Sequence, residues 1–280
     1  MKKAVKNIKI PETTKKILSL LEENGYSAYI VGGYVRDLIR EADLQNSDID
    51  IATNATPNEV EHLFSDSEGV VYPLGKKYGT IGFQPKETNQ TFEITTYRTE
   101  QTYSDGRHPD KVSFADTIEE DLSRRDFTCN SVACDAKGKI VDPFNGIEDI
   151  NNKIIRCVGN PKERFEEDKL RILRALRFAS QLGFEIEETT ASAVREMKDT
   201  INSVSSERLR EELTKLICGK NAKEVLTIYS DIIFEVIPEL KPLYKYDQKT
   251  KYHSHDAWEH TLIVLDKMPG GSPISGEIGR

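Results

Sequence analysis

The pattern of apolar and polar positions divides the chain into an N-terminal half with strand and helix signals and a C-terminal half with helix signals only. From about Glu163, apolar residues recur every three or four positions, the period of a helix that faces a core on one side. Helices are predicted over 163–182, 189–202, 206–218 and 221–235. The sequence therefore predicts an α+β protein, with a mixed-sheet domain over about 1–150 followed by an all-helical part.

Short helices and β-rich runs alternate through the first hundred residues. Helices are predicted over 12–24, 34–40 and 56–64. Strands are predicted over 27–31, 47–52, 69–73, 79–84 and 91–97, and the polar turn between the last two indicates a hairpin. Residues 99–111 are polar and include Gly106 and Pro109, so they are predicted to form a mobile loop.

Two acids interrupt a run that otherwise reads as a buried strand. Asp48 and Asp50 flank Ile49, and residues two apart in a strand project from the same face. Their carboxylates repel each other unless a cation or hydrogen bonds hold them. Glu93 interrupts another predicted strand and is a third candidate. The acids predict a Mg²⁺ site; the alternatives are hydrogen bonds to neighbouring loops for the pair and an ordinary solvent-facing position for Glu93.

A pair of glycines joins a predicted strand to a predicted helix just before these acids. Gly32 and Gly33 allow a tight turn that leaves backbone amides at the positive end of the helix, where an anion is favoured. Arg36, one turn into the helix, and Arg125, further along the chain, are candidates to donate to the same phosphate. An ordinary turn and a charged helix start are the alternatives. Together with the acids, these residues indicate a nucleoside triphosphate and Mg²⁺.

Three arginines share one face of the helix predicted from Glu163. Arg171, Arg174 and Arg177 repel one another at this spacing unless an acid or an anion compensates them. Asp168 lies at the edge of that face. A carboxylate can accept from the exocyclic amino group of cytosine or adenine while a guanidinium donates to the ring, so the pair predicts selection of C and A. A solvated charged face is the alternative.

Composition limits the classes of function. The chain has 280 residues, enough for two domains, and its net charge of −8 argues against a uniformly basic nucleic-acid binder. The segment from Lys153 to Arg177, however, contains eight basic and four acidic residues, so positive charge is concentrated there.

The sequence also predicts where the protein is located and how its cysteines are used. No apolar run approaches the roughly 20 residues that a membrane-spanning helix needs. Polar residues interrupt the stretch after Met1 where a secretory signal would lie, so a cytoplasmic location is predicted. The four cysteines form no Cys-x-x-Cys pair, and reduced structural thiols are predicted instead of a zinc site.

Eight segments occur in an order known from one enzyme family. They read VGGYVRD, SDIDIAT, YGTIGF, FEITTYRTEQTYSDGRHPDKVSF, EEDLSRRDFTCNSVACD, VDPFNG, RFEEDKLRILRALRFA and SSERLREEL. In this order the chain resembles the bacterial class II tRNA nucleotidyltransferases, the CCA-adding enzymes, over roughly residues 12–270. Each segment alone is a modest signal, whereas the ordered series is specific.

The resemblance implies an architecture and an activity. It implies a polymerase-β-like nucleotidyltransferase head over 1–150, a helical neck that reads the base and binds RNA over 151–220, the start of a helical body over 221–268, and a linker over 269–280. It also implies template-independent addition of CMP and AMP to the tRNA 3′ end from CTP and ATP. A membrane or protein partner is not expected.

The resemblance also assigns roles to single residues. It implies Mg²⁺ ligands at Asp48 and Asp50, and Glu207 and Arg208 as residues that brace the base-reading helix. It implies nucleotide contacts at Gly33, Arg36, Arg125, Asp168, Arg171, Arg174 and Arg177.

Several related activities stay open at this stage. A full-length loop over 98–111 favours complete CCA addition over CC addition, while A-only addition and poly(A) addition are alternatives within the family. A silent RNA-binding module is the non-enzymatic alternative. Residues 252–261 resemble the start of an HD-type phosphohydrolase domain with His260 as its first ligand. Family members continue beyond the position of Arg280, so a truncation or the loss of a tail is expected.

Overall fold

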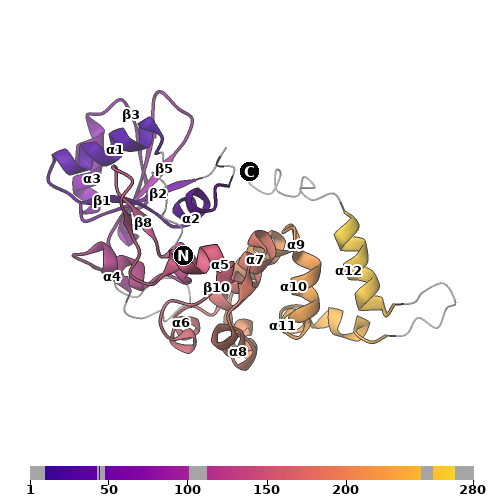
Figure 1. The fold of residues 1–280 in the computed structure, drawn as a ribbon. Coiled ribbons are helices and arrows are strands. Elements are labelled where there is room, and N and C mark those ends of the chain that lie inside the picture. Colours follow the sequence, from indigo (N-terminus) through magenta and orange to yellow (C-terminus); the bar gives the residue numbers. More distant parts are fainter. Residues whose placement is uncertain (1–9, 43, 45–47, 101–111, 247–254, 269–280) are drawn as a thin grey trace. The chain divides into compact units, whose positions relative to one another are not determined.

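The computed structural model describes residues 10–42, 44, 48–100, 112–246 and 255–268 (Figure 1). Residue contacts divide the chain into two compact units. Unit 1 comprises residues 1–152 and 156–159, and unit 2 comprises residues 153–155 and 160–280. The chain therefore enters the second unit for three residues, returns to the first for four, and then leaves it.

Unit 1 is built on a seven-stranded sheet in the order β3-β4-β5-β2-β1-β8-β9. β2 and β5 run parallel and the other neighbouring pairs are antiparallel, so the sheet is mixed and the predicted hairpin of β4 and β5 is confirmed. The strands are β1 (Ala28–Val31), β2 (Ile49–Thr53), β3 (Gly69–Gly75), β4 (Thr80–Pro85), β5 (Phe92–Thr96), β8 (Ala133–Cys134) and β9 (Ile140–Val141). A separate ribbon pairs β6 (Arg98–Glu100) with β7 (Val112–Phe114).

Both faces of this sheet are covered by buried apolar side chains. On one face, Ile51 of β2 is fully buried, and Phe64 and Phe83 pack with ring centroids 4.6 Å apart. On the other face, Ala52 joins a buried cluster that includes Ile118. The helices of the unit are α1 (Glu12–Glu23), α2 (Gly33–Ile39), α3 (Pro57–Ser65), α4 (Ile118–Ser123) and α5 (Gly146–Asn152), with 3₁₀ turns η1 (Lys76–Tyr78) and η2 (Thr128–Asn130). Alternation along β2 therefore gives each face its own core.

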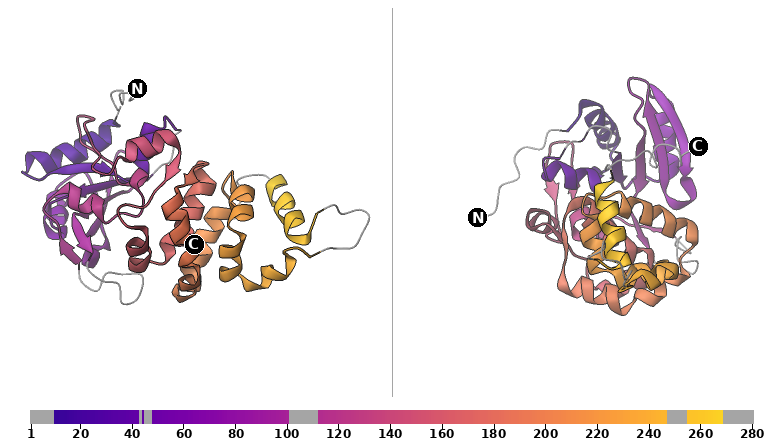
Figure 2. Two further views of the ribbon diagram at one scale, coloured as in Figure 1. Left: turned by 60° about the horizontal axis from the view of Figure 1, so that its bottom comes forward. Right: turned by 90° about the vertical axis from the view of Figure 1, so that its right-hand side faces the viewer.

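Unit 2 is mostly helical, and with unit 1 it confirms the predicted α+β class. Its helices are α6 (Pro161–Glu167), α7 (Leu170–Leu182), α8 (Glu188–Glu196), η3 (Lys198–Ser203), α9 (Ser206–Ile217), α10 (Ala222–Ile228), α11 (Ser230–Val236), η4 (Pro238–Leu243) and α12 (Ala257–Lys267). A short parallel pair joins β10 (Ile154–Ile155) to β11 (Glu185–Ile186). Figure 2 shows α10 and α12 side by side.

The close approach of α7 and the end of α9 depends on small residues. The Ser180 hydroxyl donates to the Leu216 carbonyl oxygen at 2.7 Å, and both residues are buried. A Cβ atom at Gly219 would collide with Ser180, so the chain can turn there only with glycine. This packing holds the arginine-bearing helix α7 against α9.

Within the described ranges, every helix is too short or too polar to span a lipid bilayer.

The prediction of one helix over 163–182 is wrong at its centre. Asp168 has extended backbone angles, φ −144° and ψ 105°, and separates α6 from α7. Its carboxylate accepts the backbone N–H of Leu170 at 3.1 Å. A short acidic side chain that binds nearby backbone competes with the helical hydrogen bond, which explains the break. Asp168 therefore lies in a bend between two helices and not on the arginine face of one helix.

Smaller differences concern other element boundaries. The helix predicted over 221–235 is interrupted at Tyr229, which ends α10 and precedes α11. The predicted loop over 99–111 begins inside strand β6, and residues 101–111 lie outside the described ranges. The segment that resembles an HD domain also falls partly outside them, while His260 lies within α12.

Candidate active site

Two acids lie directly opposite each other at the start of neighbouring strands. Asp50 of β2 is the register partner of Glu93 on the parallel strand β5. Asp48 is exposed and precedes β2 by one residue, while Ile49 is buried with 2% of its surface exposed. The structure thus brings Asp50 and Glu93 to one position on the sheet, next to Asp48.

The electrostatics show that the three carboxylates influence one another. Burial raises the pKa of Asp50, the charge of Arg125 lowers it, and the charge of Asp48 raises it. Partial desolvation raises the pKa of Glu93, and the charges of Asp50 and Asp48 raise it further. Carboxylates whose negative charges repel one another in this way favour a nearby cation.

The donor set fits a hard divalent cation in its chemistry. Carboxylate oxygens from Asp48, Asp50 and Glu93 are the ligand type that Mg²⁺ prefers, with water and phosphate oxygens completing its shell. Among the described residues, however, no group of three or more His, Cys, Asp or Glu side chains is already arranged to enclose a metal ion.

Gly32 brings the backbone close to this group of acids. It precedes α2 with φ 74°, a conformation that favours glycine. A Cβ atom there would lie 3.4 Å from Asp50 Oδ2 and 3.4 Å from Arg125 Nη1. The guanidinium of Arg125 therefore lies beside the strand-to-helix turn and close to Asp50. Its Nη2 is held by the buried carboxylate of Asp121 at 3.0 Å.

Arg36 lies beside the glycine turn and is also bound to other residues: a Cβ atom on Gly33 would lie 3.3 Å from its Nη2. It is 7% exposed, and its Nε and Nη2 donate to Asp37 at 3.0 and 2.8 Å. Its Nη1 donates to Asn130 Oδ1 at 2.7 Å, and Asn130 in turn donates to Asp126. The guanidinium thus joins α2 to η2. Sequence reasoning missed Asn130, whose position four residues after Asp126 was the available signal.

In unit 2, the predicted base-reading pair is engaged with other residues. Asp168 Oδ2 accepts from Arg208 Nη2 at 2.8 Å. Arg171 is 7% exposed, and its Nη1 donates to Glu167 at 2.6 Å and to the Arg164 carbonyl oxygen at 3.1 Å. Arg208 therefore holds the Asp168 carboxylate.

Glu212 compensates the remaining arginines of α7. It is 5% exposed, and its Oε2 lies 2.8 Å from Arg177 Nε while its Oε1 lies 3.6 Å from Arg174 Nη1. Both guanidinium groups also lie over the ring of Phe178. The repulsion predicted for this face is thus offset by a buried acid on α9, which sequence reasoning did not identify.

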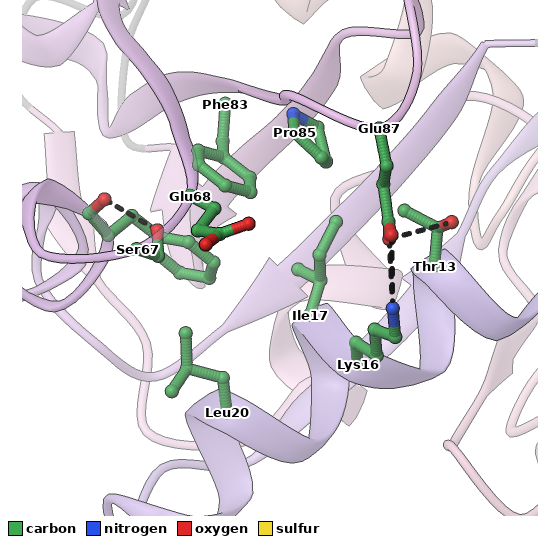
Figure 3. Close-up of a pocket in the computed structure, with 10 residues that line it drawn as sticks. Thr13, Lys16, Ile17, Leu20, Ser67, Glu68, Phe83, Pro85 and Glu87 are labelled. Atoms are coloured by element: carbon green, nitrogen blue, oxygen red, sulfur yellow. Dashed lines mark hydrogen bonds and ion pairs between the residues drawn. The ribbon is translucent and has the colours of Figure 1, made fainter.

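A cavity of about 190 Å³ lies elsewhere in unit 1, between α1, the end of α3 and β4 (Figure 3). Its walls include Ile17, Leu20 and Phe83, and Lys16 pairs with Glu87 at 3.1 Å on its rim. Phe83 points to one face of the sheet. Its neighbour Gly82 lies on the other face, together with Glu93, the register partner of Gly82. This largely apolar cavity is separate from the acids and offers no comparable group of reactive side chains.

Comparison with known families first defines the class of protein. The family model for the poly A polymerase head domain matches residues 28–156, which contain the glycine turn, the acids and Arg125. A second model, described as the probable RNA- and SrmB-binding site of polymerase A, matches residues 183–243. The chain thus combines a head domain of the poly A polymerase type with a helical part.

Individual relatives define the family more closely. A CCA-adding enzyme of Lactobacillus helveticus is 40% identical over 275 residues, which cover 95% of this chain and 67% of the relative. One from Ligilactobacillus salivarius is 46% identical and covers 79% and 54%. The crystal structure of the Bacillus stearothermophilus CCA-adding enzyme in complex with CTP is 39% identical, with a TM-score of 0.67 over 76% of this chain and 50% of that one.

The chain belongs to the CCA-adding enzyme family. It spans about half to two thirds of the length of the relatives that it matches.

Proposed function

We propose that this chain carries the catalytic and nucleotide-binding part of an enzyme that adds CMP and AMP to the 3′ end of tRNA. CTP and ATP are the proposed donors, and tRNA is the acceptor. The observation that carries the proposal is the position of Asp50 opposite Glu93, with Asp48 and Arg125 close enough to shift the pKa of Asp50. The names of the relatives and the CTP bound to one of them support it.

The acids suit an in-line displacement at phosphorus. Asp48 and Asp50 would hold Mg²⁺, which supplies positive charge to the triphosphate and to the attacking oxygen. Glu93 would orient the 3′-hydroxyl of the RNA. The hydroxyl oxygen would form a bond to the α-phosphorus and give its proton to solvent water, the bond from the α-phosphorus to the oxygen that bridges to the β-phosphorus would break, and pyrophosphate would depart. Arg125 and the backbone amides at Gly32 and Gly33 would bind the phosphates.

We assign base selection to Asp168 and Arg171. A carboxylate has about four lone-pair sites, so Asp168 can accept from the amino group of cytosine or adenine while it keeps Arg208. The contact with Arg208 also holds the carboxylate in one orientation. Arg171 would donate to the ring from its place beside Glu167. Arg174 and Arg177 would contact the nucleotide from the same helix.

Two finer points belong to the same proposal. Mg²⁺ is the proposed cation because hard carboxylate oxygens and triphosphate favour it, and a cytoplasmic location is proposed because the relatives are CCA-adding enzymes and tRNA is the proposed acceptor. Addition of the terminal A, and so complete CCA addition over CC addition, is favoured by the length of the segment at 98–111. Most of that segment lies outside the described residues.

Primer extension tests the proposed function. tRNA transcripts that end at the discriminator base, at C and at CC are incubated with labelled CTP or ATP, with Mg²⁺ or with EDTA. We expect extension of all three ends with Mg²⁺ and none with EDTA. Asp48→Ala and Asp50→Ala should abolish extension, while the exposed Asp66→Ala serves as the matched control. Extension of the CC end alone would indicate A-only activity, and equal activity of the Asp50→Ala variant would refute the assignment.

A further inference from the structure

Asp121 is a buried acid whose two oxygens serve different arginines. It lies in α4 and is 1% exposed. Its Oδ1 accepts from Arg124 Nε and Nη2, both at 2.9 Å, and its Oδ2 lies 3.0 Å from Arg125 Nη2. The backbone N–H of Arg98 donates to Oδ1 at 3.4 Å. One oxygen is therefore left to Arg125.

The charge of Asp121 is retained because of these partners. Burial raises the pKa of its carboxyl group, but the charges and hydrogen bonds of Arg124 and Arg125 lower it by more, and the net pKa lies below the ordinary value. A buried carboxylate without such partners would take up a proton instead. Asp121 is thus an anion at neutral pH.

The other side of the Arg125 guanidinium faces the candidate active site. Nη1 lies 3.4 Å from the position of a Cβ atom on Gly32, and Asp50 Oδ2 lies at the same distance from that point. Arg125 Nε is buried and has no hydrogen-bond partner among the described residues. Asp121 thus holds Nη2, while Nη1 lies at the end of the guanidinium that faces the turn and Asp50.

A long arginine side chain loses rotamer entropy when it is ordered. An ion pair formed before the substrate arrives removes part of that loss from the binding step. Arg124, in contrast, is held by Oδ1, and the guanidinium that lies beside Gly32 and Asp50 is that of Arg125. The two arginines thus share one acid but differ in their position relative to the acids of the sheet.

We propose that Asp121 is a positioning residue that holds the Arg125 guanidinium against the glycine turn, ready to bind the triphosphate of the incoming nucleotide. The proposal rests on the proposed function, since it assigns the anion that Arg125 binds. Asp121 itself touches no substrate. Its effect on the reaction passes through Arg125 alone.

A double-mutant cycle tests this dependence. The KM for CTP and kcat are measured by primer extension for the parent, Asp121→Asn, Arg125→Gln and the double variant. We expect Asp121→Asn to raise the KM roughly tenfold or more, the effect of losing one charged hydrogen bond. In the Arg125→Gln background the same change should raise the KM no further. Arg124→Gln is the matched control: it removes the other partner of the same acid, and its KM should equal that of the parent.

The outcomes separate the two proposals. If the parent extends no tRNA, the proposed function fails. The positioning role is refuted if the parent is active and the KM of Asp121→Asn equals that of the parent. It is also refuted if Asp121→Asn raises the KM by the same factor in the Arg125→Gln background as in the parent. Thermal unfolding shows whether each variant folds. Asp121→Glu keeps the charge but moves the carboxylate by one methylene, so it should fold and raise the KM by less than Asp121→Asn; an unchanged KM in this variant also counts against the proposal.

Discussion

Replacement of Glu212 by glutamine removes one negative charge from a buried site and keeps the side-chain volume. Glu212 is 5% exposed and lies 2.8 Å from Arg177 Nε and 3.6 Å from Arg174 Nη1. Two guanidinium groups on one helix face would then lose the negative charge of Glu212. We expect unit 2 to be destabilised, because Glu212 no longer offsets its share of the repulsion between these groups.

The structure limits the size of this effect. Removal of one partner from a fully buried ion pair costs about 3–5 kcal/mol. The side chain of Arg177 is 12% exposed and that of Arg174 is 31% exposed, so water can solvate part of the second charge. The N–H of Arg177 Nε also does not point at Glu212 Oε2 well enough to make a hydrogen bond. A loss of about 1–3 kcal/mol, below the cost of breaking a fully buried ion pair, is therefore expected.

Urea unfolding of the parent and Glu212→Gln measures the free-energy difference. Glu211→Gln is the matched control, since it makes the same change on the same helix at an exposed position. Its effect should stay within about 0.5 kcal/mol. If Glu212→Gln costs no more than the control, or stabilises the protein, the inference that Glu212 offsets the arginine charges in the folded state is wrong.

Three further predictions concern other parts of the chain. In the folded protein at pH 8, Cys218 should react fast with a thiol reagent, whereas Cys129, whose pKa burial raises to about 12, should react only after unfolding; Cys218→Ser should remove the fast phase. Because the pKa of Asp121 is lowered in the folded state, its contribution to stability is present above the unfolded pKa of about 3.9 and is lost as the pH falls through the folded value. Urea unfolding should therefore show the stability gap between parent and Asp121→Asn constant near pH 7 and shrinking below about pH 4. Arg208→Ala frees the Asp168 carboxylate, so incorporation of UTP and GTP relative to CTP and ATP should rise; an unchanged preference would contradict the bracing role.

Much of the local structure follows from short-range patterns. The alternation around Ile49 predicts a strand with one buried face, and the structure places Ile49 in the core with Asp50 on the other side. The Thr56 cap and the proline after it predict a helix start, and the capping box is present. These features depend on residues within four positions of one another, which is why a single sequence suffices to predict them.

The break at Asp168 shows where such patterns fail. Apolar periodicity continues through 163–182, but the Asp168 side chain binds the Leu170 N–H and Arg208, forty residues away. Periodicity reports which face is apolar and says nothing of a side chain that competes for the backbone. The single helix was therefore a reasonable prediction and a wrong one.

The sequence by itself determined the α+β class, most strands and helices of unit 1, and the residue types that suit a cation and a triphosphate. Only the tertiary structure decided which charges face one another. Glu93 lies opposite Asp50, Asn130 meets Arg36, Asp121 holds Arg125, and Glu212 meets Arg177. Three of these pairs join residues far apart in the chain. Asp121 and Arg125 are four positions apart, so their spacing already allows a local contact, and the tertiary structure adds the burial of Asp121 and the position of Arg125 beside Gly32. The physical reason is that burial sets the strength of each charge interaction, and burial is a property of the packed chain.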